Sequence, residues 1–407
     1  MSPSNSVAAS SRGSRLASID LLRGAVMVLM AIDHVRVYAG VPAGGPAPAV
    51  FFTRWVTHFC APAFVFLAGT SAFFYGKKHG DLSRFLLTRG LWLVVLELTV
   101  LRFAWTFNVD VTHVMAGVIW VIGWCMILMA GLVRLPVAAV GTIGLAIVAL
   151  HNLADPHLDQ LIPALTGGSL SGFWKILYLG FFGGPIQLGG GAEGPSLIVL
   201  YSIVPWIGVM AAGYGFGALL DRAPVRRDRL AYAIGIGATL LFLVLRGFDL
   251  YGDPRPWPSM TEPAPNGRPG LSPLLAFLNT NKYPASLAFV LMTLGPTISL
   301  MPLLERARGA LARWLTVFGR VPFFFYVLHI PLIHLLALGV SLLRTGSIDP
   351  WLFTNHPMGS PPVPEGYRWS LGLLYLIWAV AVVLLYFACR WFAKVKAERR
   401  WWWLSYV

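Results

Sequence analysis

The sequence predicts an all-α membrane protein, a polytopic bundle of about ten transmembrane helices. The first observation is composition: 57% of the 407 residues are hydrophobic and only 12% are charged, with a mean hydropathy of +0.69. Soluble domains carry about twice that charged fraction. The second is that apolar runs of about 20 residues, the length that crosses a bilayer, recur along the chain. The third is that basic residues gather in alternate connections between these runs.

These runs define ten predicted spans, at about residues 17–38, 51–75, 85–106, 113–133, 136–152, 196–219, 230–247, 283–302, 320–342 and 369–392. By the positive-inside rule, the basic connections and both termini lie in the cytoplasm, and the three long loops lie outside. The net charge of +14 is therefore explained by membrane topology. We expect the lipid bilayer, and not nucleic acid, as the partner of this charge.

The chain divides into three parts. Residues 1–16 form a polar, serine-rich tail that we expect to be disordered, and they lack the features of a signal peptide. Residues 17–392 form a single bundle. Residues 393–407 are basic and then tryptophan-rich, which is typical of an interfacial anchor.

The first span carries ionisable residues on one face. At about 100° per residue, Asp20, Arg23, Met27, Met30 and His34 fall within a narrow stripe. Asp20 and His34 are separated by about 21 Å of helical rise. This face therefore presents a charge pair near one membrane surface and an imidazole near the other. The simpler interpretation of Asp20 and Arg23 is a first-turn acid with its i+3 partner.

Other ionisable residues at membrane depth are functional candidates because their burial in lipid is costly. His58 lies at a depth similar to that of His34, and His329 lies near the middle of span nine, before the kink expected at Pro331. Asp33 adjoins His34 but is expected on roughly the opposite side of the helix, where it is poorly placed to orient the ring. The alternative for each histidine is a hydrogen-bonded packing role.

A metal site is conceivable from His34, His58 and His113. No short-range ligand spacing supports it, and we expect no metal.

Several motifs resemble a bacterial branch of the heparan-α-glucosaminide N-acetyltransferase catalytic-domain family. They are Arg15-x4-Asp20-x2-Arg23-Gly24, Asp33-His34, the segment from His58 to Gly69, the segment from Arg89 to Glu97, Pro205-Trp206, and Phe318-Gly-Arg320 through His329. The Asp-x2-Arg-x10-His arrangement is also similar to the opening helix of membrane acyltransferases that O-acylate surface sugars.

The resemblance implies an enzyme of the bacterial inner membrane that carries an acyl group from cytosolic acyl-CoA to an acceptor on the far side. His34 matches the catalytic histidine of the O-acylating group, and Asp20 and Arg23 match its opening. The animal N-acetyltransferase departs from this pattern. As aligned, it has Asn at the position of His34, Asp at the position of His58, and its catalytic histidine near Pro48.

We therefore expect acetyl-CoA or another acyl-CoA as co-substrate, with its phosphates held by basic residues at the inner end, namely Arg23, Arg89 and Arg320 beside Asp20. His34 acts as general base on a hydroxyl or amine, for which an imidazole pKa near 6.5 is suitable. His58 or His329 assists, and Asp33 completes the candidate group. The acceptor is a glycan or another periplasmic molecule, and the sequence leaves the oligomeric state open, with a homodimer among the alternatives.

Two other functions remain open. A proton-coupled transporter or exporter would use the same histidines and acids as a relay. A non-catalytic membrane scaffold would leave the polar cluster as an unexplained cost.

Overall fold

The computed structural model describes residues 16–189, 194–263, 269–359 and 361–399, together with Trp401 and Leu404. The predicted N-terminal tail, except Leu16, lies outside the described residues. So does most of the C-terminal segment after Arg399, including two of its three consecutive tryptophans.

Long helices make up most of the described chain. They are α1 (Ala17–Tyr38), α3 (Cys60–Gly76), α4 (Leu82–Leu96), α6 (Val118–Leu132), α7 (Val137–Leu150), α10 (Ile203–Leu220), α11 (Pro224–Gly247), α13 (Leu287–Arg306), α14 (Ala310–Arg320), α15 (Pro322–Thr345) and α16 (Leu371–Glu398). Two of them are extended by further turns. Helix α3 is preceded by α2 (Pro48–Trp55) and η1 (Val56–Phe59), and α4 continues through η2 (Glu97–Leu101) into α5 (Arg102–Thr106).

Short elements occupy the connections. The helical ones are η3 (His151–His157), α8 (Leu158–Thr166), α9 (Ser171–Trp174), η4 (Lys175–Leu179), η5 (Gly180–Gly183), η7 (Pro258–Thr261), α12 (Pro273–Leu278), η8 (Pro350–Phe353) and η9 (His356–Met358). A small sheet has the order β1–β3–β2, with strands β1 (His113–Ala116), β2 (Ile186–Gln187) and β3 (Ser196–Val199). Strand β1 pairs in parallel with β3, and His113 lies opposite Ser196.

The helical membrane bundle is confirmed. Seven helical segments of the described chain are long and apolar enough to cross a membrane, and each predicted span coincides with a helical segment. Four predicted starts were wrong by four residues or more. Helices α6, α10 and α13 begin only at Val118, Ile203 and Leu287, and α11 begins already at Pro224. Strands β1 and β3 occupy the first residues of two of those spans. The number of spans and their sidedness stay predictions.

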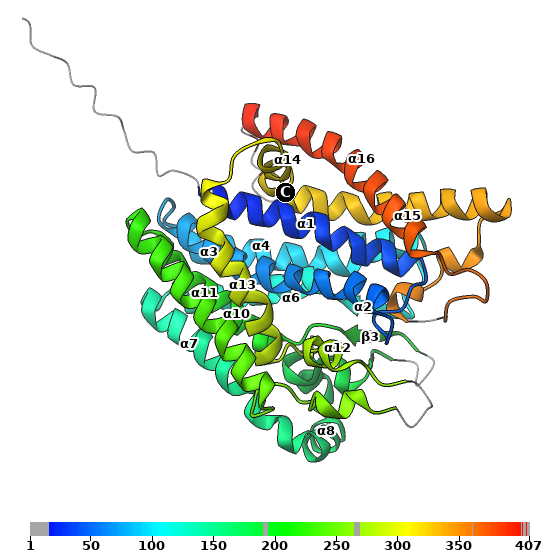
Figure 1. Ribbon diagram of the computed structural model, residues 1–407, viewed down its shortest axis with the longest axis horizontal. Helices are drawn as coiled ribbons and strands as arrows, with labels where there is room; N and C mark the ends of the chain where they lie inside the picture. Colours follow the sequence, from blue (N-terminus) through cyan, green and yellow to red (C-terminus); the bar gives the residue numbers. More distant parts are fainter. Residues whose placement is uncertain are drawn as a thin grey trace, which may run out of the picture.

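Helix α1 runs through the interior of the bundle (Figure 1). It contacts α3 on one side and α13, α14, α15 and α16 on the others. Two glycines allow its closest crossing: a Cβ atom at Gly24 would overlap the carbonyl oxygen of Leu315, and one at Gly319 would overlap the carbonyl oxygen of Asp20. This backbone contact between α1 and α14 brings Arg320, the last residue of α14, to the level of Arg23.

Candidate functional site

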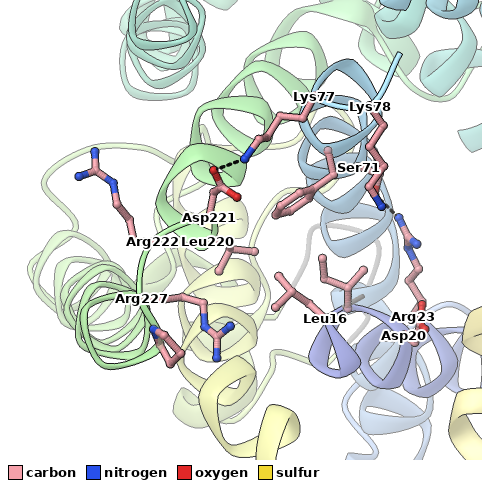
Figure 2. Close-up of a pocket in the computed structure, with 13 residues that line it drawn as sticks. Leu16, Asp20, Arg23, Ser71, Lys77, Lys78, Leu220, Asp221, Arg222 and Arg227 are labelled. Carbon is pink, nitrogen blue, oxygen red and sulfur yellow. Dashed lines mark hydrogen bonds and ion pairs between the residues drawn. The ribbon is translucent and has the colours of Figure 1, made fainter. Parts of the chain in front are cut away.

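The predicted polar face of α1 lines three adjoining cavities. The first, here called the entry pocket, has a volume of about 640 Å³ and is lined by Asp20 and Arg23 of α1. The opposite walls come from α3, α10 and α11 and are rich in basic side chains, namely Lys77, Lys78, Arg222 and Arg227. Figure 2 shows these side chains around the opening, with Lys77 paired to Asp221. The entry pocket is suited to a negatively charged ligand.

The second cavity, here called the basic cavity, has a volume of about 370 Å³ and shares Arg23 with the entry pocket. Four cationic side chains line it: Arg23, Arg89, Arg320 and Lys396. Its remaining wall is apolar and is contributed by α1, α3, α4, α6 and α15, with Met27, Phe64 and Val118 among its residues. Arg23 donates hydrogen bonds to Ser71 Oγ and to the carbonyl oxygen of Leu67, which fixes it between the two spaces.

The third cavity, here called the histidine cavity, has a volume of about 40 Å³ and shares Phe64 and Val118 with the basic cavity. Met30 and His34 of α1 line it. The stripe predicted on α1 thus borders all three spaces in order: Asp20 and Arg23, then Met27, then Met30 and His34.

His34 and His329 form the closest polar contact of this site. His34 Nδ1 lies 2.5 Å from His329 Nε2, and the two rings stack with centroids 4.7 Å apart. His329 Nδ1 contacts the carbonyl oxygens of Tyr326, at 2.6 Å, and Phe325, at 3.1 Å. Carbonyl oxygens only accept, so His329 Nδ1 carries the hydrogen.

The hydrogen on His329 Nδ1 also determines which nitrogen of His34 carries a hydrogen. In a neutral His329 ring, Nε2 is the acceptor, so His34 Nδ1 must be the donor and His34 Nε2 keeps its lone pair. No described group bonds His34 Nε2, and Trp105 packs edge-on against the ring at 4.8 Å. The pair therefore orients His34 and leaves its Nε2 able to accept a proton.

Asp33 differs from its predicted position. It lines the histidine cavity together with His34, because adjacent helical residues differ by about 100° and not 180°. Its carboxylate accepts hydrogen bonds from Arg36 Nε, at 2.7 Å, and from Arg54. Asp33 thus holds two cations beside the cavity.

His58 is not on the wall of the histidine cavity, where its neighbour Thr57 takes the place. It is buried, and its ring packs edge-on against Phe289 with centroids 5.5 Å apart. The similar depth predicted for His34 and His58 is therefore insufficient to bring them to one cavity. Within the described ranges no group of three or more His, Cys, Asp or Glu residues could hold a metal, and the absence of a metal stays a prediction.

Sequence reasoning missed four residues of this site. Tyr201 and Lys282 line the histidine cavity from outer segments of the chain. Arg54 donates to Asp33 and to the Tyr283 hydroxyl, which is 3.2 Å away. Of the four, Arg54 had a signal in the sequence, because it is a charged residue near the outer end of the predicted span 51–75. Lys282 and the tyrosines lie in connections whose folding over the bundle no local pattern reveals.

Positive charge dominates around these outer residues. Burial lowers the pKa of the Lys282 ammonium, and Arg54 lowers it further. For Tyr283, burial raises the pKa, but the cations Lys282 and Arg54 outweigh burial and lower it to about 8. The outer end of the site therefore favours an anion.

Comparison with known proteins gives one family. No curated protein matches the chain. The profile of the catalytic region of heparan-alpha-glucosaminide N-acetyltransferase matches residues 15–247, which is more than half of the 407 residues. That range contains six of the predicted site residues, Asp20, Arg23, Asp33, His34, His58 and Arg89, while Arg320 and His329 follow it. The chain therefore belongs to the heparan-alpha-glucosaminide N-acetyltransferase catalytic-domain family and is a multi-pass membrane enzyme of the acetyltransferase type.

Proposed function

We propose that the protein transfers an acetyl or other acyl group from cytosolic acyl-CoA to a hydroxyl or amine of a periplasmic acceptor, with a sugar as the acceptor class. The membrane is then the cytoplasmic membrane of a bacterium. The observation that supports this most directly is the order of groups along α1. Two basic cavities precede a small cavity in which a histidine has an unpaired ring nitrogen.

The basic side chains would bind the phosphates of the donor. The basic cavity, of about 370 Å³, is lined by Arg23, Arg89 and Arg320. Charge-assisted hydrogen bonds to phosphate oxygens are among the stronger protein contacts. From Arg23 to His34 the helix rises about 16 Å, a distance that an extended pantetheine arm spans. The thioester would then lie at the shared wall formed by Phe64 and Val118.

His34 would act as general base. Its Nε2 takes the proton from the acceptor hydroxyl or amine as the oxygen or nitrogen attacks the thioester carbon. His329 fixes the ring through the Nδ1 contact, and its own Nδ1 is held by the carbonyl oxygens of α15. A positioned base of this kind contributes about 10²–10⁴-fold to rate.

The test is transfer of label from radiolabelled acetyl-CoA by the purified full chain in nanodiscs, with and without outer-surface glycans. We expect the wild type to label an acceptor and His34→Gln to be slowed by roughly 10²-fold or more. His79→Gln is the matched control, because His79 is exposed and its ring contacts the carbonyl oxygen of Tyr75, four residues earlier in the chain. Wild-type protein that transfers no label, but moves a substrate across proteoliposomes without an acyl donor, would support the transporter instead.

A further inference from the structure

Lys282 is a buried cation that the proposed function does not yet use. It is 8% exposed, yet it follows an outer loop and lies between α12 and α13. Taking an ammonium out of water is costly, so a lysine in such a place is expected to have a compensating partner. Among the described residues its ammonium contacts Tyr283, lying 5.2 Å from the ring centroid. An ammonium has three donors, so capacity remains for a ligand.

The charges near the histidine cavity do not balance. Arg36 and Arg54 are ion-paired with the single carboxylate of Asp33. Lys282, a third cation, lines the same cavity as Asp33 and forms no ion pair with it among the described contacts. Arg36 and Arg54 are occupied: Arg36 also donates to the carbonyl oxygen of Val41, at 2.7 Å, and Arg54 to Tyr283. Of these three cations, Lys282 is thus the one whose charge is least compensated by the described residues, and it is the one that lines the cavity.

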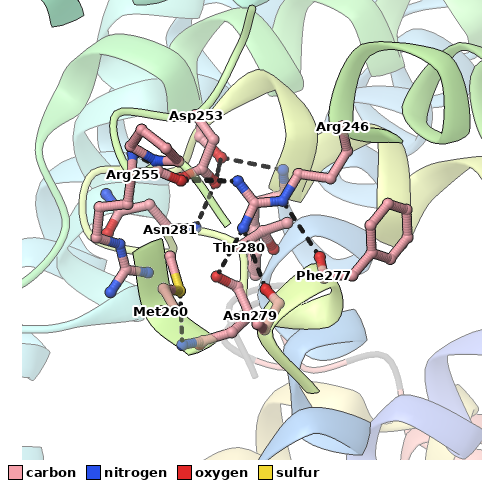
Figure 3. Close-up of polar contacts among 12 residues, drawn as sticks. Arg246, Asp253, Arg255, Met260, Phe277, Asn279, Thr280 and Asn281 are labelled. Atoms are coloured by element: carbon pink, nitrogen blue, oxygen red, sulfur yellow. Dashed lines mark hydrogen bonds and ion pairs between the residues drawn. The ribbon is translucent and has the colours of Figure 1, made fainter. Parts of the chain in front are cut away.

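The backbone around Lys282 is held by a dense network, shown in Figure 3. Arg246 is 1% exposed and donates to the carbonyl oxygens of Arg255, Ala276, Phe277 and Asn279. Asp253 lies 3.6 Å from Arg246 and accepts from the backbone N–H of Asn281, at 2.8 Å, and from Ser286. The residues on both sides of Lys282 are therefore anchored, and its position at the cavity is specified by the fold.

The cavity is small enough to decide what Lys282 meets there. A water needs roughly 10–15 Å³ of such volume, so about 40 Å³ admits a group of roughly three or four non-hydrogen atoms. An acetyl group has that size, whereas a sugar ring does not. The cavity, which both His34 and Lys282 line, is therefore suited to the reacting carbonyl group itself.

Resting on the proposed acyl transfer, we propose that Lys282 is a further catalytic residue, whose ammonium stabilises the negative charge that develops on the thioester oxygen. In this step the acceptor oxygen or nitrogen bonds the carbonyl carbon, and the carbonyl π pair moves to the oxygen beside Lys282. The acceptor proton passes to His34 Nε2. The C–S bond then breaks as the carbonyl re-forms, and the leaving thiolate takes the proton from His34.

The physical advantage is that the charge is placed before the reaction begins. A buried ammonium that forms no ion pair with a described carboxylate is costly in the resting enzyme and becomes favourable when the oxyanion forms. The interaction is therefore stronger in the transition state than in the ground state, which is the condition for accelerating chemistry. Removing one preorganised oxyanion donor typically costs about 10²–10³-fold in kcat.

The experiment measures kcat, and KM for acetyl-CoA, in wild type, Lys282→Met and the control Lys175→Met, each as the full chain in nanodiscs. Lys175 is a lysine of another connection, and it bonds the carbonyl oxygen of Pro185. We expect Lys282→Met to lower kcat by roughly 10²-fold with KM for acetyl-CoA unchanged, and the control to match wild type. If Lys282→Met does not fold, the near-isosteric Lys282→Gln replaces it.

Two acceptors separate oxyanion stabilisation from recognition of an anionic acceptor. If Lys282 acts on the thioester oxygen, Lys282→Met should lower kcat by the same factor with a neutral sugar and with a hexuronic acid as acceptor. A loss confined to the hexuronic acid, or unchanged kcat with both, overturns the inference while leaving acyl transfer by the wild type intact. Absence of transfer by the wild type would instead refute the proposed function.

Discussion

His34 Nδ1 and His329 Nε2 are 2.5 Å apart and join two helices that are almost 300 residues apart in the chain. The carbonyl oxygens behind His329 determine which nitrogen of each ring carries hydrogen. Because of this, Nε2 is the nitrogen of His34 that keeps its lone pair, and the following predictions depend on its proposed role as the base or on the charges around it.

Replacing His329 by Phe should slow acyl transfer less than replacing His34. The Phe ring removes the acceptor for His34 Nδ1–H, so the His34 ring loses its fixed tautomer but keeps a basic nitrogen. We expect a smaller loss than the about 10²–10⁴-fold expected for loss of the base. The measurement is kcat for both variants with the same acceptor. Equal losses would mean that the two imidazoles act as one unit in the chemical step.

The basic cavity should govern affinity for the donor more than turnover. Arg320→Gln removes one of four cations from the wall, and a hydrogen bond to a charged group contributes about 1.5–3 kcal/mol. We expect the Kd for acetyl-CoA to rise by roughly 10–100-fold, measured by calorimetry. Arg308→Gln is the control, because Arg308 is not among the residues that line the basic cavity and donates to the carbonyl oxygens of Glu305 and Ala307. A Kd that stays at the wild-type value in Arg320→Gln would exclude this cavity as the phosphate site.

Gly24→Ala should destabilise the bundle where α1 and α14 cross. The added Cβ would overlap the carbonyl oxygen of Leu315, and overpacking of this type costs about 1–3 kcal/mol. Thermal unfolding in detergent measures the effect. Gly339→Ala, in α15, is the control, since a Cβ there meets nothing within 4 Å. An unchanged Tm for Gly24→Ala would show that the crossing has room to separate.

Tyr283 should ionise near pH 8, well below the usual tyrosine value of about 10, because Lys282 and Arg54 favour the phenolate more than burial opposes it. A lowered folded-state pKa stabilises the fold above it. The contribution of Tyr283 to stability should therefore rise between about pH 8 and pH 10 and be absent below about pH 8. The difference in tyrosinate absorbance between wild type and Tyr283→Phe measures the midpoint.

A matched variant tests the cause of that shift. Lys282→Met removes a cation and should raise the midpoint of Tyr283, whereas Lys175→Met should leave it in place. If the Tyr283 midpoint is the same in Lys282→Met as in wild type, the Lys282 ammonium lies away from the Tyr283 hydroxyl. That result would argue against its position at the histidine cavity.

Much of the fold could be predicted from composition and helical periodicity. The bounds of α1 agree with the predicted span at both ends, and the stripe from Asp20 to His34 lines the cavities in the predicted order. Both predictions depend on the length of an apolar run and on the angle between residues of one helix, which follow from the sequence alone. Arg23, Arg89 and Arg320 also reach one cavity, as expected of basic residues near the same membrane surface.

The rest depends on contacts between distant segments. The pairing of β1 with β3 joins residues more than 80 positions apart, so the apolar pattern of each strand was read as the start of a span. Lys282 reaches the site on a loop that is anchored by Arg246 and Asp253. Helical or strand periodicity in the sequence does not predict how such a loop folds. The orientation of Asp33 was wrong for a simpler reason, an overestimate of the angle between adjacent residues.

The most direct test of the central claim is affinity labelling with bromoacetyl-CoA, which places a reactive carbon next to the thioester. Mass spectrometry of the labelled full chain should find the adduct on His34, with free CoA protecting it and His34→Gln eliminating it. Labelling that leaves His34 unmodified while it modifies a residue outside the histidine cavity would contradict the account.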